Sequence, residues 1–290
     1  MFTGSLVAIV TPFRRGKVDE RALAELIEWQ IADGTNGIVP CGTTGESATL
    51  SHSEHNRVIE LTVEVVRRRV PVIAGTGSNS TEEAITLTKH AKQAGADGAL
   101  LITPYYNKPT QEGLYRHYKA VAEAVDLPLV LYNIPGRTGV NMLPSTIARL
   151  SAVNTIVGVK EGSGSVLQAS DIVQMCGDRL TVLAGDDSLT LPMMAVGGKG
   201  VITVTANIMP MEMAELVKAF ADGKIDEARR IHFKLSPLFA ALFYETNPIP
   251  VKEALGLMRK IDPELRLPLC PMGQDTREKL IRVLKDAALI

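Results

Sequence analysis

The chain has 290 residues, with 31 Lys and Arg against 32 Asp and Glu and a formal net charge of −1 at pH 7. This balance argues against a nucleic-acid-binding protein, which would need a clustered basic face. The composition, 46% apolar and 22% charged, is that of a soluble globular protein, and no apolar run approaches the roughly 18–20 residues of a membrane span. Cys41, Cys176 and Cys270 form no C-x-x-C pair, which favours a reducing compartment over a disulfide framework or a zinc site. We therefore expect a cytoplasmic protein with no nucleic-acid or membrane partner.

A short apolar run followed by a stretch of helical period recurs through the first two thirds of the chain. The eight runs are 6–10, 37–41, 70–74, 99–103, 129–133, 155–160, 180–184 and 200–205. Their spacing of about 28 residues is that of a βα unit. Helices are predicted between them, for example over 21–32, 52–68 and 81–94, the last of which should end at Gly95.

Apolar strands that alternate with helices indicate a parallel sheet covered by helices, and eight such units predict an α/β fold of the (β/α)₈ TIM-barrel type. The alternative is a doubly wound open sheet, whose usual marker is a G-x-G-x-x-G turn after the first strand. The first run here is followed instead by Thr11, Pro12 and Phe13, which favours the barrel.

The strand pattern stops after about residue 224. Beyond it, the segments 225–244, 251–258 and 276–288 are predicted as helices separated by prolines. We therefore divide the chain into a (β/α)₈ catalytic barrel over 1–224 and a C-terminal helical region over 225–290.

Active sites of TIM barrels lie at the C-terminal ends of the strands, and Lys160 closes the sixth run. It shares one face of that strand with Gly158 and Ile156, so an inward-facing Lys160 would stand in the confined mouth of the barrel. Desolvation there would lower its pKa from about 10.4 to roughly 7–8 and make it a nucleophile for a carbonyl carbon. The alternative is a lysine that reaches from the strand end to water.

Polar groups at neighbouring strand ends could complete such a site. Tyr132 ends the preceding strand, about 4.8 Å away, and its phenol could pass protons as a carbinolamine forms and loses water. The loop 42–46, Gly-Thr-Thr-Gly-Glu, offers hydroxyl and N–H donors to an anion, and Arg137 suits a carboxylate. Taken singly, a packed rim tyrosine, an ordinary turn and a surface arginine are the structural alternatives.

Two pairs of possible metal ligands are weak candidates. His52 and His55 could share one helical face, but no third ligand is evident. Asp186 and Asp187 open a helical stretch and are predicted to cap it. We expect no metal site.

Together these motifs resemble the pyruvate-dependent class I aldolase superfamily, which includes N-acetylneuraminate lyase and carries G-x-x-G-E after the second strand and a lysine on the sixth. Two further motifs, YNIPGRTG at 132–139 and PYYN at 104–107, resemble the dihydrodipicolinate synthase family within it. The resemblance covers residues 1–252.

The resemblance implies condensation of pyruvate with L-aspartate 4-semialdehyde on the diaminopimelate route to L-lysine. Lys160 would form an imine with pyruvate, so that no external cofactor is required. Thr43, Tyr132 and Tyr106 would form a proton relay. Tyr106 would reach in from a neighbouring subunit, in a homotetramer that is a dimer of dimers.

The resemblance also implies where substrates and an effector bind. Thr44 would hold the pyruvate carboxylate, Arg137 would receive the semialdehyde, and the Ile202 carbonyl would border the site. Feedback inhibition by L-lysine is expected at a subunit interface. The positions that match the family's lysine site are Ser47, Ala48, His52, His55, Asn79, Glu83 and Tyr105.

Two rival classes of function stay open at this point. N-acetylneuraminate lyase or a 2-keto-3-deoxy sugar-acid aldolase would use the same lysine in the cleavage direction, although Arg137 after Tyr-Asn-x-Pro disfavours both. A non-catalytic sensor on this fold would be expected to lose Lys160 or a relay tyrosine, and neither is lost.

Overall fold

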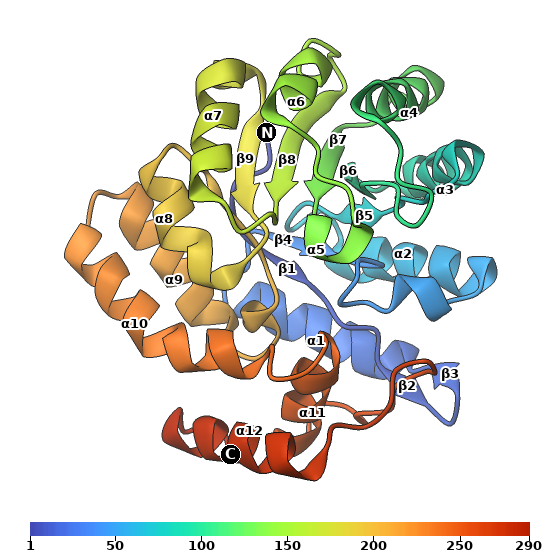
Figure 1. Ribbon diagram of the computed structural model, residues 1–290. Coiled ribbons are helices and arrows are strands. Elements are labelled where there is room, and N and C mark those ends of the chain that lie inside the picture. The colour runs from blue at the N-terminus through green and yellow to red at the C-terminus, as the bar shows by residue number, and fades with distance from the viewer.

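The computed structural model, which describes all 290 residues, shows a ring of parallel strands surrounded by helices (Figure 1). The eight-stranded sheet has the order β4-β1-β10-β9-β8-β7-β6-β5. A parallel bridge between Ile38 and Val72 joins its two ends, which closes the ring. The strands are β1 (Gly4–Ala8), β4 (Gly37–Val39), β5 (Ile73–Gly75), β6 (Gly98–Ile102), β7 (Leu129–Asn133), β8 (Ile156–Glu161), β9 (Thr181–Ala184) and β10 (Gly200–Thr203). The predicted (β/α)₈ barrel is confirmed.

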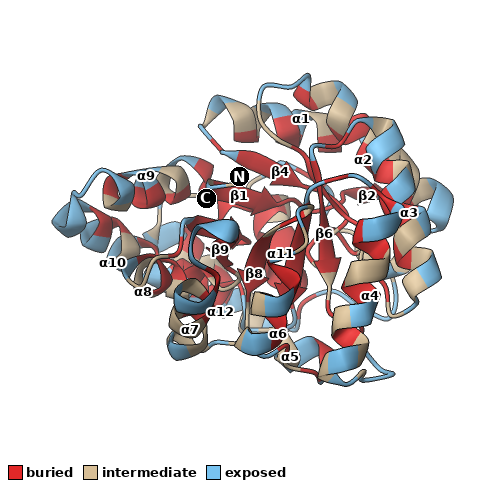
Figure 2. Ribbon diagram, turned by 90° about the horizontal axis from the view of Figure 1, so that it is seen from above, coloured by how far each residue is buried: buried red, intermediate tan, exposed pale blue.

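Helices cover the outside of this ring, and their outward faces are exposed while the strands are buried (Figure 2). The barrel helices are α1 (Glu20–Ala32), α2 (His52–Val66), α3 (Thr81–Ala94), α4 (Gln111–Ala124), α5 (Pro135–Thr138), α6 (Pro144–Leu150), α7 (Val166–Cys176), α8 (Thr190–Ala195) and α9 (Pro210–Ala221). Four single 3₁₀ turns lie in the connections: η1 (Ser47–Thr49), η2 (Gly177–Arg179), η3 (Asp187–Leu189) and η4 (Thr205–Asn207).

Local sequence explains where the helices beside the barrel mouth begin and end. A capping box starts α2, because the Ser51 hydroxyl accepts the Glu54 N–H while the Glu54 carboxylate accepts the Ser51 N–H. The helix stops at Val66, short of the predicted residue 68, because Arg67 adopts a left-handed φ of 51°. α3 ends as predicted at Gly95, whose φ is 91°.

Side-chain alternation along the strands produces two apolar layers. Leu6 and Ala8 of β1 face inward, whereas Val7 between them belongs to the larger layer under the helices. The inner layer consists of Leu6, Ala8, Val39, Ile73, Leu100, Val130, Tyr132, Leu183 and Ile202. The barrel interior is therefore filled with side chains and leaves room for chemistry only at its mouth.

The chain beyond the barrel forms three more helices, as predicted: α10 (Ile225–Ala241), α11 (Ile249–Leu257) and α12 (Gln274–Asp286). Leu235, Val251 and Leu280 from these helices are buried in the same apolar layer as the barrel helices. The C-terminal helices therefore share a core with the barrel, and the boundary at residue 224 stays a prediction.

One small element was not predicted. A hairpin of β2 (Phe13–Arg14) and β3 (Lys17–Val18) turns through Arg15 and Gly16, both of which have positive φ. Two-residue strands leave no alternation in the sequence to detect. None of the helices is long and apolar enough to cross a membrane.

Candidate active site

Lys160 lies on β8 at the mouth of the barrel, opposite Tyr132 on β7. The two residues are register partners across these strands and are each only 5% exposed. The Lys160 Nζ lies 4.2 Å from the centroid of the Tyr132 ring. The next register pair, Asn133 and Glu161, is joined by a side-chain hydrogen bond, because Asn133 Nδ2 donates to the Glu161 carboxylate at 3.1 Å. The amine and the phenol are therefore held side by side by two hydrogen-bonded strands.

The surroundings of Lys160 favour its neutral form. Burial lowers the pKa of the amine to about 8, with the Arg137 charge acting in the same direction and the Asp187 carboxylate opposing it. About one tenth of an amine with this pKa is neutral at pH 7, against a few parts in ten thousand for an ordinary lysine. Lys160 can therefore act as a nucleophile near neutral pH.

The phenol of Tyr132 is held in its protonated form. Burial raises the pKa of Tyr132 to about 12, although the Arg137 charge and the Thr43 side chain oppose this shift. A protonated phenol can donate a proton to a departing hydroxyl and recover it from a neighbouring group. Tyr132 therefore suits proton transfer better than attack as a phenolate.

The threonine loop 42–46 is held tightly at the end of β4. Gly75 at the end of β5 has no space for a side chain, because an added Cβ would lie 2.2 Å from the Cys41 carbonyl oxygen. Thr44 is buried, and its Oγ1 accepts a hydrogen bond from Asn247 Nδ2 at 3.0 Å. The Asn247 carbonyl in turn accepts from Arg137 Nη2 at 3.0 Å. One residue of the C-terminal region thus touches two predicted substrate-binding residues.

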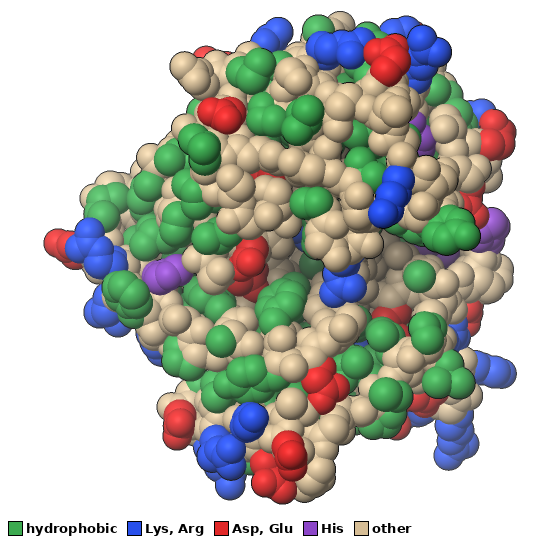
Figure 3. Space-filling model, viewed as in Figure 1, with side chains coloured by type: hydrophobic (Ala, Val, Ile, Leu, Met, Phe, Trp, Pro, Cys, Tyr) green, Lys and Arg blue, Asp and Glu red, His purple; other side chains and the backbone are tan.

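A cavity of about 1030 Å³ opens beside this loop. It includes Thr43, Tyr106 and Arg137 from the predicted catalytic and substrate-binding set. It also includes six of the seven predicted effector residues: Ser47, Ala48, His52, His55, Glu83 and Tyr105. Lys160 and Tyr132 are not among its lining residues and lie deeper in the barrel. On the face drawn in Figure 3, the surface is hollowed near its middle, and basic side chains are scattered among acidic and apolar ones.

The predicted effector residues come from three consecutive βα units, with His52 and His55 on α2 and Glu83 on α3. His52 Nε2 lies 3.0 Å from Glu83 Oε1, and the Glu83 carboxylate also accepts from the Ser78 hydroxyl. Hydrogen bonding from Ser78, supported by His52 and opposed by partial burial, lowers the pKa of the Glu83 carboxyl. His55 is buried, and its Nε2 lies 2.9 Å from the Gly75 carbonyl oxygen. The two histidines therefore have separate partners.

The remaining predicted residues, Tyr106, Asn79 and Ile202, lie in three different environments. Tyr106 is 89% exposed with a left-handed φ of 69°, and its hydroxyl makes no hydrogen bond within the chain. Asn79 lies beside the cavity without lining it, and its carbonyl accepts from Asn107 Nδ2 at 2.9 Å. Ile202 is a fully buried member of the inner apolar layer.

Sequence reasoning missed two groups near the site. Asp186 caps η3 as predicted, since its carboxylate accepts the Ser188 N–H. Asp187, in contrast, is buried and accepts the backbone N–H of Thr205 at 2.6 Å. Its carboxylate opposes the lowering of the Lys160 pKa by burial. Asn247 lies more than 100 residues from either of its partners along the chain. No local pattern could have indicated either contact.

Comparison with known proteins identifies the family. The sequence model of the dihydrodipicolinate synthetase family matches residues 1–287. The chain belongs to this family. Relatives from Geotalea daltonii and Thermodesulfovibrio yellowstonii, both named 4-hydroxy-tetrahydrodipicolinate synthase, are 64% and 61% identical over 290 residues, which is the full length of every chain compared. The predicted family is confirmed, and the chain is an enzyme of the lyase class.

Solved structures of the family have the same fold. A chloride-inhibited dihydrodipicolinate synthase from Acinetobacter baumannii, complexed with pyruvate, is 50% identical with a TM-score of 0.98 over 100% of both chains. The enzyme from Cyanidioschyzon merolae, with lysine bound, is 41% identical with a TM-score of 0.96, over 100% of this chain and 99% of that one.

Proposed function

We propose that this enzyme condenses pyruvate with L-aspartate 4-semialdehyde through an imine on Lys160, in the diaminopimelate route to L-lysine. The observation that carries the proposal is the buried Lys160 amine, with its pKa lowered to about 8, facing the Tyr132 ring at the mouth of the barrel. The family match and the pyruvate held by the Acinetobacter baumannii relative support pyruvate as the first substrate.

The reaction uses the Lys160 amine as its only covalent group. The neutral amine attacks the keto carbon of pyruvate, and the carbinolamine loses water to give an imine. Loss of a proton from the methyl group gives an enamine, whose carbon attacks the aldehyde carbon of the second substrate. The amino group of that substrate then displaces Lys160 by transimination. Because the imine serves as the electron sink, the sequence of steps needs no external cofactor.

The surrounding residues take the roles that move protons and hold carboxylates. Tyr132, Thr43 and Tyr106 pass protons during formation of the carbinolamine and its dehydration. Thr44, held by Asn247, binds the pyruvate carboxylate. Arg137 binds the semialdehyde as it enters through the cavity, and the Ile202 carbonyl borders the site.

A coupled assay with purified protein tests this assignment. Pyruvate should be consumed only when L-aspartate 4-semialdehyde is also present, and Lys160→Ala should abolish this consumption. N-acetylneuraminate and 2-keto-3-deoxy sugar acids are offered separately as substrates for cleavage. If the enzyme cleaves either of these sugar acids faster than it condenses pyruvate with L-aspartate 4-semialdehyde, its function is that aldolase activity and not the proposed condensation.

We further propose that L-lysine inhibits the enzyme from the part of the cavity that six of the seven effector residues line. Glu83 supports this, because its carboxyl has a lowered pKa and offers a negative charge to an ammonium group. Tyr105 on the wall and Asn79 beside it can hydrogen-bond a carboxylate. The lysine bound by the Cyanidioschyzon merolae relative supports the choice of ligand.

Initial rates measured against lysine concentration, with both substrates near half-saturation, test the effector site. Glu83→Gln should abolish most of the inhibition, because the carboxylate for the ammonium group is lost. Glu60→Gln is the matched control, since Glu60 also pairs with a histidine, His90, but lies outside the cavity. Equal inhibition in the wild type and Glu83→Gln would contradict the proposed site.

The proposed assembly is a homotetramer built as a dimer of dimers, in which Tyr106 serves the active site of its neighbour. The exposure of 89% and the left-handed φ of Tyr106 support this, because an exposed tyrosine in a constrained conformation is suited to insertion into a second copy. A cytoplasmic location stays a prediction from the sequence.

A further inference from the structure

A fully buried ion pair joins the C-terminal helical region to the threonine loop. Lys252 on α11 is 0% exposed and Glu46 is 3% exposed, and the Lys252 Nζ lies 2.6 Å from Glu46 Oε1. The same Nζ donates to the Thr11 carbonyl at 3.0 Å and lies 4.3 Å from the Phe13 ring centroid. One side chain of the C-terminal region therefore reaches the connections after both β1 and β4.

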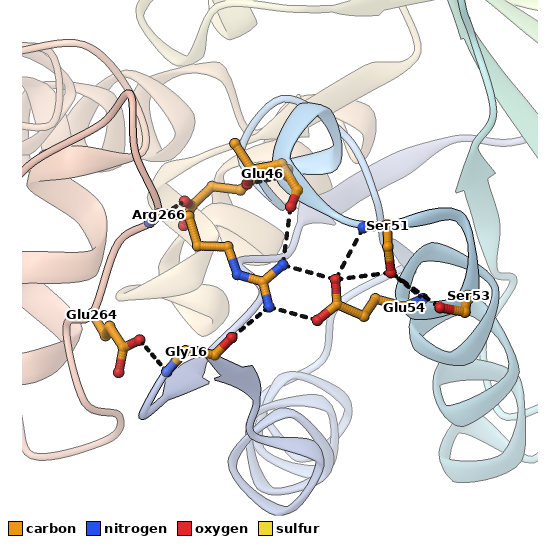
Figure 4. A network of polar contacts seen from close by, with 8 residues as sticks. Gly16, Glu46, Ser51, Ser53, Glu54, Glu264 and Arg266 are labelled. Atoms are coloured by element: carbon orange, nitrogen blue, oxygen red, sulfur yellow. Dashed lines mark hydrogen bonds and ion pairs between the residues drawn. The ribbon is translucent and has the colours of Figure 1, made fainter.

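The other oxygen of Glu46 is held from the same region. Glu46 Oε2 accepts the backbone N–H of Arg266 at 3.3 Å. The Arg266 guanidinium, which lies between Glu46 and Glu54 in Figure 4, donates to the Thr49 carbonyl at 2.9 Å and to the Glu54 carboxylate at 2.8 Å. Both oxygens of the Glu46 carboxylate thus accept hydrogen bonds from the C-terminal region, one from Lys252 and one from Arg266.

The contacts of Glu46 bear directly on Thr43. The Glu46 N–H donates to the Thr43 carbonyl at 3.1 Å, and Glu46 itself has a left-handed φ of 52°. Thr44 has a separate anchor in Asn247. The Glu46 carboxylate therefore sets the backbone that carries the Thr43 hydroxyl, whereas the position of Thr44 has independent support.

A buried ion pair is a poor means of stabilising a fold, because the loss of hydration offsets most of the attraction between the charges. Its hydrogen bonds are directional, however, and fix the position of the groups they join. We propose that Lys252 and Glu46 are positioning residues, which hold Thr43 in line with Tyr132 for proton transfer. The inference rests on the proposed function and assigns the C-terminal region a part in catalysis, although it contributes no reacting group.

The test uses a double variant, Lys252→Met with Glu46→Gln, that removes both charges while keeping similar side-chain volumes. Because a displacement of about 1 Å can lower a rate by about 100-fold, we expect kcat to fall by about 10- to 100-fold. The KM for pyruvate should stay within about twofold, since Thr44 keeps its Asn247 anchor. The final yield of pyruvate adduct, trapped to completion by borohydride, should stay at the wild-type level, because Lys160 is untouched and a misplaced Thr43 slows imine formation without changing its endpoint.

A second variant, Glu46→Asp, keeps the charge but shortens the side chain by one methylene group. It should show the same fall in kcat with full adduct yield, and it decides the matter if the double variant is insoluble. The matched control is Arg277→Met with Glu253→Gln, which breaks an ion pair of 2.6 Å between α12 and α11 without touching the loop. The control should retain wild-type kcat.

Wild-type kcat in Glu46→Asp at full adduct yield would overturn the inference. So would kcat and adduct yield that fall in parallel, because that result indicates loss of folded protein only. If the wild type itself gives no pyruvate adduct, the proposed function falls, and the inference falls with it. Adduct and turnover in the wild type, with unchanged kcat in the loop variants, would contradict the inference alone.

Discussion

Lys160 and Lys252 are both buried, but different groups surround their ammonium groups. Lys252 is paired with the Glu46 carboxylate, which opposes the lowering of its pKa by burial. Lys160 has no carboxylate within ion-pair distance and faces the Tyr132 ring instead, so its pKa falls to about 8. The two lysines therefore differ in the partner beside the ammonium group, which matches the nucleophilic role proposed for Lys160 and the positioning role proposed for Lys252.

Replacement of Lys160 should stabilise the fold. A pKa lowered from 10.5 to about 8 means that protonated Lys160 destabilises the native state by on the order of 3 kcal/mol, at about 1.36 kcal/mol per pKa unit. Lys160→Met should therefore raise the free energy of unfolding at pH 7. Between pH 8 and 10.5 the native state binds fewer protons than the unfolded state, so the free energy of unfolding of the wild type increases as the pH rises. The difference in unfolding free energy between Lys160→Met and the wild type should therefore become smaller.

Urea unfolding of the wild type and Lys160→Met at pH 7 and pH 10.5 checks this prediction. A variant less stable than the wild type at pH 7, or a difference that does not change with pH, would contradict the desolvation of Lys160.

The sequence predicted Lys160 and Tyr132 because strand alternation and strand spacing are local rules. Asp187, Asn247 and Lys252 could not be predicted in the same way. Each acts on the site through a contact that depends on how distant segments fold together, and each has an ordinary local interpretation as a cap, a loop residue or a helix residue.

At the scale of the elements, the ends of the strands decide the shape of the mouth. The strand over 129–133 matches its prediction, but the strand predicted over 37–41 ends at Val39. Cys41 adopts a left-handed φ of 55°, which ends the extended conformation and begins the threonine loop. The strand predicted over 200–205 likewise ends at Thr203, because η4 follows. Apolar patterns locate strands well but do not show where a backbone turns.

Gly75 should be essential to this arrangement. In Gly75→Ala the added Cβ would lie 2.2 Å from the Cys41 carbonyl oxygen and 2.6 Å from its carbon, and neither backbone atom can move without shifting the threonine loop. We expect a loss of about 1–3 kcal/mol in the free energy of unfolding, as for other overpacked sites. Gly136→Ala is the control, because nothing lies within 4 Å of its added Cβ. Equal unfolding free energies of the two variants would contradict the close packing of β5 against the loop.

At the scale of the whole molecule, one cavity connects the predicted effector residues with the entrance to the catalytic site. Thr43 and Ser47 both line it from the connection between β4 and α2, only four residues apart, and Glu46 between them is tied to the C-terminal region. A ligand that shifts Ser47 can therefore act on Thr43 through a short stretch of backbone. Tyr106 lines the same cavity and is exposed at the protein surface.

Mixed oligomers should reveal whether Tyr106 acts in a neighbouring subunit. Tyr106→Phe and Lys160→Ala should each be nearly inactive alone. In a two-fold pair with exchange of Tyr106, a mixed dimer contains one complete site, so random mixing should restore roughly one quarter of wild-type activity. Coexpression followed by the coupled assay measures this. No recovery in verified mixed oligomers would place Tyr106 in its own subunit.

Borohydride trapping followed by peptide mass spectrometry shows whether Lys160 forms an imine with pyruvate. We expect one three-carbon adduct per chain, located on Lys160, with Lys252 and the surface lysines unmodified. The adduct should be absent from Lys160→Ala. An adduct on another lysine, or none in the presence of saturating pyruvate, would contradict the assignment of Lys160 as the nucleophile.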